Sequence, residues 1–231
     1  MIITIFHERV KDDFNPTMID LHTHTLFSDG ELLPSELVRR AEVMGYTAIA
    51  LTDHVDSSNI DFVVPRIAAV CKVLNKYWKI RSIPGAEITH APIQEIARLV
   101  KSARRLGAKI VVVHGETVSE PVLPGTNRAA IRARCDILAH PGWIKKEDAL
   151  LAVKFKVCLE LTTRKSHSLT NKHVIRMARS SGAKLVIDND AHGSDDLVSR
   201  ANAIRALKKL SLSKREIEAI FRNSARLVAM Y

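Results

Sequence analysis

The chain has 231 residues, 46% of them hydrophobic and 26% charged, which is typical of a globular protein that buries a core and argues against disorder. Thirty-five Lys and Arg against twenty-five Asp and Glu give a net charge of +10, which favours anionic partners without choosing among phosphorylated metabolites, nucleic acid and acidic membranes. Three scattered cysteines argue against a disulfide framework or a thiolate zinc finger, so we expect a reducing, cytoplasmic setting.

The first residues do not resemble a secretory signal, because Glu8, Lys11 and two aspartates interrupt the apolar stretch. No window approaches eighteen apolar residues, so we expect neither secretion nor a membrane span. No low-complexity linker or shift in composition marks a second domain. We therefore expect one domain over residues 1–231.

Short apolar or β-branched runs alternate with longer amphipathic segments along the chain. This pattern predicts βα units around a parallel sheet. We expect seven strands, near residues 17–21, 48–52, 80–86, 109–113, 136–139, 157–161 and 184–188. An all-α or all-β fold is hard to reconcile with the pattern.

The first helical segment follows Pro34 and Ser35, which suit the early turn and the cap of a helix. This helix and those in "EIARLVKSARRLG" and "NKHVIRMARSSG" each end at a glycine, which predicts left-handed C-caps at Gly45, Gly107 and Gly182.

The tail from residue 195 to 231 predicts two further helices that cover the outside or one end of the barrel. One is expected near 196–209, and the other starts at Ser213, where Ser213 and Glu216 form a capping box.

Histidines and carboxylates gather where the expected strands end. The candidate metal ligands in chain order are His22, His24, Asp29, His54, Glu87, His114, His140, Asp190 and His192. In a parallel barrel all these ends open onto one face, where active sites are built. Imidazoles and carboxylates without thiols suit Zn²⁺, Mn²⁺ or Fe at a site with open positions for water or substrate.

Each ligand candidate also has an ordinary interpretation when taken alone. A single His-x-His, or the histidine in "VVHG", is more often a satisfied polar group than a ligand. Asp29 before Gly30 reads as a turn residue, and Glu87 could be a charge at a helix start. Nine such residues at successive strand ends are much harder to explain in this way.

The motifs "DLHTHTLFSDG", "ALTDH", "PGAEIT", "VVHG", "LAHPG" and "NDAH" resemble, in order, those of the PHP (polymerase and histidinol phosphatase) superfamily. The resemblance covers about residues 18–193. It implies a distorted (β/α)7 barrel, similar to a TIM barrel, with two or three divalent metal ions in a cleft at its C-terminal face.

The resemblance also implies a role for each ligand. The first ion would take His22, His24, Glu87 and Asp190, the second Glu87, His114 and His140, and the third Asp29, His54 and His192. Glu87 would bridge the first two ions, and the catalytic residues would be Asp190, His192 and Glu87. Some relatives have a histidine at the Asp29 position, which leaves occupancy of the third site open. Asp20 and Asp53 are either orienters of ligand histidines or purely structural.

A cluster of cations binds phosphate oxygens and lowers the pKa of a bridging water, so phosphoester hydrolysis by metal-activated hydroxide is the reaction class expected. The loop "LELTTRKSHS" offers Glu160, Arg164, Lys165 and His167, of which Arg164 and His167 are candidate substrate contacts. Arg128 is a further candidate. A solvated basic loop is the alternative interpretation. His7, His90 and His173 are left unassigned.

Three functions remain open at this point. The leading hypothesis is a phosphatase acting on a small phosphomonoester, with histidinol phosphate one candidate. A second is a nucleic-acid phosphodiesterase or exonuclease of the PHP type, to which the positive charge gives some weight. A third is a noncatalytic RNA-binding barrel resembling the archaeal ribonuclease P protein subunit, although such relatives lack the metal ligands that are present here. We expect no membrane partner, and the oligomeric state is not indicated.

Overall fold

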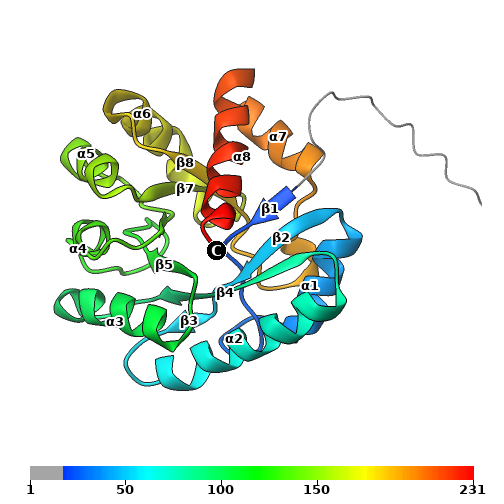
Figure 1. The fold of residues 1–231 in the computed structure, drawn as a ribbon. Coiled ribbons are helices and arrows are strands. Elements are labelled where there is room, and N and C mark those ends of the chain that lie inside the picture. The colour runs from blue at the N-terminus through cyan, green and yellow to red at the C-terminus, as the bar shows by residue number, and fades with distance from the viewer. Residues whose placement is uncertain (1–17) are drawn as a thin grey trace, which may run out of the picture.

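The structure, a computed structural model, describes residues 18–231. Seven parallel strands follow one another around a barrel in the order β1 (Met18–Asp20), β2 (Tyr46–Leu51), β4 (Arg81–Ile88), β5 (Ile110–His114), β6 (Ile137–Ala139), β7 (Cys158–Thr162) and β8 (Leu185–Asp188). The short strand β3 (His54–Val55) pairs with the end of β4. A parallel bridge between Thr23 and Ala191 joins the two ends of the sheet, so the barrel is nearly closed (Figure 1). The predicted distorted (β/α)7 fold is confirmed.

Helices surround this sheet (Figure 1). They are α1 (Pro34–Val43), α2 (Ile60–Tyr77), α3 (Ile93–Leu106), α4 (Thr126–Arg132), α5 (Lys146–Phe155), α6 (Asn171–Ser181), α7 (Arg200–Lys209) and α8 (Lys214–Ala229). Two 3-10 turns, Ser168–Thr170 and Ser194–Asp196, interrupt the loops after β7 and β8. No helix within residues 18–231 has the length and apolarity needed to span a bilayer.

The core has two parts, because each strand has one face toward the helices and one toward the barrel axis. The inner part contains small and branched residues such as Ala48, Ala50 and Val112. Leu227, near the end of α8, packs into this inner cluster. The hydroxyl of Tyr231 lies 3.4 Å from an oxygen of Asp136, just before β6. Helix α8 therefore covers the N-terminal end of the barrel and leaves the C-terminal end for the site.

The helix signals were mostly right. Gly45, Gly107 and Gly182 all have left-handed backbone angles, as expected of residues that end helices. The capping role expected of Ser35 is wrong, because Pro34 already occupies the first helical position and Leu33 precedes it without a side-chain hydrogen bond.

Helix α7 begins at Arg200 rather than at residue 196. Asp196 is used differently, since its carboxylate accepts hydrogen bonds from the backbone amides of His192 and Gly193. Ser199 then caps the helix by accepting from the amide of Asn202. The capping box of Ser213 and Glu216 is confirmed at the start of α8.

Replacing Glu216 with Gln is expected to lower the free energy of unfolding at neutral pH by less than about 1 kcal/mol, because the pair with Arg179 is partly exposed. Hydrogen bonds from Arg179 and Ser213 lower the pKa of Glu216 to about 2, from 4.5 in the unfolded chain. The stabilisation is thus complete above pH 4.5 and is lost as the pH falls towards 2. Urea unfolding at neutral and acidic pH, with Glu218→Gln on the same helix as a control, measures it. If the difference in free energy of unfolding between wild type and Glu216→Gln is the same at both pH values, the predicted pH dependence is wrong.

Candidate metal centre

All nine candidate ligands lie at the C-terminal ends of strands, where the barrel brings them together. His22, His24 and Asp29 follow β1, His54 follows β2 and starts β3, Glu87 lies near the end of β4, His114 ends β5, His140 follows β6, and Asp190 and His192 follow β8. They come from positions up to 170 residues apart, yet they surround one region. His22, His24 and Glu87 are completely buried.

The innermost group consists of His22, His24, Glu87 and Asp190. His22 Nε2 lies 3.2 Å from Glu87 Oε1 and 3.6 Å from Asp190 Oδ1. His24 Nε2 lies 3.1 Å from Asp190 Oδ1 and 3.8 Å from Glu87 Oε2. Two imidazoles and two carboxylates thus converge in the arrangement that the resemblance implied for the first ion.

The hydrogen bonding around His22 fits a cation. Its Nδ1 lies 2.6 Å from Glu160 Oε1, and a carboxylate in this position holds the ring proton on Nδ1 and turns the Nε2 lone pair inward. His22 Nε2, both ring nitrogens of His24 and Glu87 Oε1 are all buried without a hydrogen-bond partner. Burying such atoms unpaired is costly, and a bound cation would satisfy them together.

His24 is also suited to ligation because it is neutral. Burial is the largest influence and lowers the pKa of His24 to about 4, against the opposing effect of Asp190. A neutral imidazole is the form that binds metals.

The second group contains Glu87, His114 and His140, whose ligand atoms lie within 4.8 Å of one another. The Nδ1 atom of His114 is 3.2 Å from the Gly115 carbonyl oxygen, so the other ring nitrogen, Nε2, faces the cavity. His140 has a backbone φ of 23°, in a region that non-glycine residues rarely adopt. Asp190 has a φ of 53°, so two of the candidate ligands are held by strained backbone.

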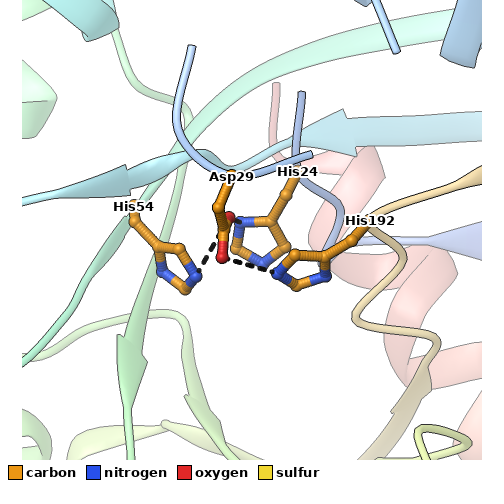
Figure 2. A group of neighbouring side chains, drawn as sticks. All are labelled: His24, Asp29, His54 and His192. Carbon is orange, nitrogen blue, oxygen red and sulfur yellow. Dashed lines mark ion pairs between the residues drawn. The ribbon is translucent and has the colours of Figure 1, made fainter. Parts of the chain in front are cut away.

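The third group combines Asp29, His54 and His192 with the second nitrogen of His24 (Figure 2). The Asp29 carboxylate points between the rings, with one oxygen 3.5 Å from His54 Nε2 and the other 3.2 Å from His192 Nε2. Partial burial alone would raise the pKa of Asp29, but the contacts with His192 and His54 hold it well below its usual range. This group is the most open to solvent, since the Asp29 side chain is 57% exposed.

Glu160 differs from the expectation that it lies on a loop facing the cleft. It lies within β7, is completely buried, and bonds both the His22 ring and the backbone amide of His140, which is 2.8 Å from its Oε2. It therefore positions two candidate ligands. The alternation of side chains along a strand at residues 158–162 could have predicted that Glu160 points into the barrel.

Asp20 and Asp53 contact no ligand ring. Asp20 accepts hydrogen bonds from the amides of His22 and Asn189, and burial raises its pKa to about 7. Asp53 accepts from the amide and hydroxyl of Thr25 and from the hydroxyl of Ser28. Both therefore shape the backbone beside the ligands.

A cavity of about 280 Å³ opens above these groups. Its lining includes six of the nine ligand candidates together with Arg164 and His167, as expected for substrate contacts. Arg128 differs from the expectation that it contacts substrate. It pairs with Asp148 at 2.6 Å, on the side of α4 that faces α5, and does not line the cavity. The cavity also contains His90 and Glu120, which the sequence interpretation did not assign.

His173, one of the unassigned histidines, plays no part in the cavity. His173 lies within hydrogen-bonding distance of the Ile144 carbonyl, 2.8 Å from its Nε2, and its ring lies edge-on to Trp143. His7 falls outside the residues that the structure describes.

Comparison with solved structures supports the fold. A chain in the cryo-EM structure of archaeal ribonuclease P with mature tRNA superposes with a TM-score of 0.71 at 17% identity, covering 92% of this chain and 90% of that one. The apo N6-methyl-AMP deaminase of Arabidopsis thaliana gives a TM-score of 0.57 at 14% identity, covering 90% of both chains. At these identities the likeness concerns the fold alone.

Comparison with curated proteins supports the family. The chain is 46% identical to the uncharacterized protein MJ1295 of Methanocaldococcus jannaschii, over 86% of this chain and 92% of that protein. It is 24% identical to the DNA polymerase/3'-5' exonuclease PolX of Bacillus subtilis, over 82% of this chain but 37% of PolX. The model of the PHP domain matches residues 20–199. PHP domains are in general metal-dependent hydrolases that bind several metal ions, and this chain belongs to that family.

Proposed function

We propose that the protein hydrolyses a small phosphomonoester with the help of two or three divalent cations, Zn²⁺, Mn²⁺ or Fe among them. The supporting observation is the buried set of unpaired imidazole nitrogens, together with Glu87 Oε1, among ligand candidates of which six line a cavity. Bound cations would act as Lewis acids toward phosphate oxygens and would lower the pKa of a coordinated water. The nine residues named above would hold them, with Asp190, His192 and Glu87 nearest to the chemistry.

Arg164 is suited to bind the substrate's phosphate. Its guanidinium lies at the cavity edge, where it donates a hydrogen bond of 2.9 Å to the Asp190 carbonyl oxygen. Its side chain is 31% exposed, so it is anchored yet reachable from the cavity. An arginine at this place offers several N–H groups to an anionic oxygen.

His167 is suited to donate a hydrogen bond to the substrate. Its Nδ1 lies 2.8 Å from the hydroxyls of both Thr117 and Ser119, which can donate to it. The proton is then on Nε2, which faces the cavity between Glu120 and Asp190 at 3.4 and 3.8 Å. This geometry orients a donor toward the place of a phosphate or leaving-group oxygen.

The size of the cavity favours a small substrate. At about 280 Å³ it is at the lower end of the range for pockets that take small molecules.

The experiment is phosphate release from a panel of phosphomonoesters, histidinol phosphate included, by metal-stripped protein reloaded separately with Mn²⁺ and Zn²⁺. Turnover that depends on metal, with one ester far above the others, is the expected result. Protein kept in chelator is the control. Absence of release from every ester with both metals would reject the proposal.

Cleavage of nucleic-acid phosphodiesters is the second candidate, favoured by the similarity to PolX, whose name includes a 3'-5' exonuclease, and by the net charge of +10. Binding of oligonucleotides that weakens steeply with salt, followed by metal-dependent shortening, would support it. Salt-sensitive binding of RNA without shortening would instead support a noncatalytic role, as would protein that takes up no metal.

A further inference from the structure

His90 and Glu120 reach the outer edge of the cavity beside His114, outside the set that the family resemblance covers. His90 follows the end of β4, and Glu120 lies in the loop between β5 and α4. One carboxylate oxygen, Glu120 Oε2, lies 3.0 Å from His90 Nε2 and 3.2 Å from His114 Nε2. Two imidazoles from different strands therefore converge on a single oxygen.

The hydrogen bonding of His114 indicates how its ring meets the Glu120 carboxylate. Its Nδ1 faces the Gly115 carbonyl oxygen, which can only accept, so the ring proton belongs on Nδ1. With a single proton there, the ring presents the Nε2 lone pair to Glu120 Oε2, itself an acceptor. Two acceptors at 3.2 Å need either a second ring proton or a metal cation between them, and an Nδ1–H to carbonyl contact is the usual support of a metal-binding histidine.

The spacing matches that of a tetrahedral metal. Ligand atoms bound to Zn²⁺ at ordinary bond lengths are about 3.3 Å apart. The two contacts of Glu120 Oε2, at 3.0 and 3.2 Å, are close to this edge length. Two histidines and one carboxylate, with further positions open, are a donor set typical of zinc in enzymes.

His90 also shares the backbone feature of two inner ligand candidates. Its φ is 49°, beside 53° for Asp190 and 23° for His140. Such backbone conformations cost free energy and cluster at functional sites.

We propose that His90, His114 and Glu120 hold a divalent transition-metal cation such as Zn²⁺ at the outer edge of the cavity. His114 Nε2 binds one cation at a time, so this outer position alternates with the inner position formed by Glu87, His114 and His140. His90 and Glu120 are 42% and 36% exposed, whereas Glu87 is buried, so the outer position lies on the solvent side of the inner one.

The test uses Co²⁺, because its visible absorption reports the number and type of its ligands. His140→Ala removes the inner position and leaves the outer one, so this variant is expected to keep the Co²⁺ that His114 binds. His140→Ala/Glu120→Gln and His140→Ala/His90→Ala are expected to lose one equivalent of Co²⁺ and its absorption. Metal content after dialysis and circular dichroism are measured on the same samples.

The matched control is His140→Ala/Glu95→Gln, since Glu95 has an exposed carboxylate, 40% accessible, that pairs with Arg98 on α3 away from the cavity. If His140→Ala does not fold, Glu87→Gln serves as the background. The same Co²⁺ content and spectrum with and without Glu120 overturn the proposal, since Glu120 would then only pair with protonated histidines. Loss of this Co²⁺ already in the background variant overturns it as well. Because the readout is metal binding, this test is independent of whether any phosphoester is hydrolysed.

Discussion

Asp190→Asn is expected to lower the turnover of the best phosphoester by about 10³-fold or more, since contributions of several kcal/mol are typical of a catalytic metal. Asp190 lies 3.1 Å from His24 Nε2 through one oxygen and 3.8 Å from His140 Nε2 through the other, so it joins the first two ligand groups. Asparagine keeps the shape and tolerates the φ of 53°, but it removes the charge. Initial rates with Mn²⁺ and Zn²⁺, alongside metal content, measure the effect.

Asp195→Asn is the matched control, because Asp195 lies exposed on the 3-10 turn after β8, where its carboxylate accepts a hydrogen bond from the Ser194 hydroxyl. It should retain wild-type turnover. Both variants should unfold near the wild-type temperature. Full activity in Asp190→Asn would remove Asp190 from the proposed centre and, with it, the supporting argument for the function.

Glu160→Gln is expected to weaken binding of the first cation by about 10- to 100-fold, the usual effect of losing the partner of a ligand histidine. The side-chain oxygen of the glutamine can still accept the hydrogen bond from the His140 amide that Glu160 Oε2 accepts in the wild type. Its NH₂ group would then face His22 Nδ1, where the carboxylate is 2.6 Å away, and would move the ring proton to Nε2. That proton occupies the lone pair that the cation needs.

Titration of metal-stripped protein with Zn²⁺ in competition with a chelator measures this change. Thr162→Ser, at the end of the same strand, tests whether any change within β7 has the same effect. Binding of Zn²⁺ by Glu160→Gln with wild-type affinity would show that Glu160 stabilises the barrel without orienting His22.

The fold was predictable because its signals are local. Alternating apolar runs and amphipathic segments identify βα units, and glycines such as Gly107 and Gly182 end helices through their left-handed angles. The errors at Ser35 and residue 196 have different causes. Pro34 is already the first residue of α1, so Ser35 lies inside the helix. The Asp196 carboxylate accepts hydrogen bonds from the backbone of the loop that carries His192, so the helix starts later.

The site was predictable in part. Motif order placed the nine ligand candidates at strand ends, and parallel strands bring such ends to one face. Arg128 does not reach the cavity because its position on α4 directs its side chain toward α5, where it pairs with Asp148. Glu160 was taken for a loop residue, although an inward position in a short buried strand directs its carboxylate to His22 and His140.

The sequence by itself determined the alternating architecture, the family motifs and the residue types that favour a metal centre, since each of these depends on short segments of chain. Only the tertiary structure decided which side chains meet: Glu160 with His22, and His90 with Glu120 and His114. His22 and Glu160 are separated by 138 residues and His90 and Glu120 by 30, and their contact depends on barrel closure and on the conformation of two loops. Neither is encoded in a local pattern, so the hydrogen bonds that orient the ligands became visible only in three dimensions.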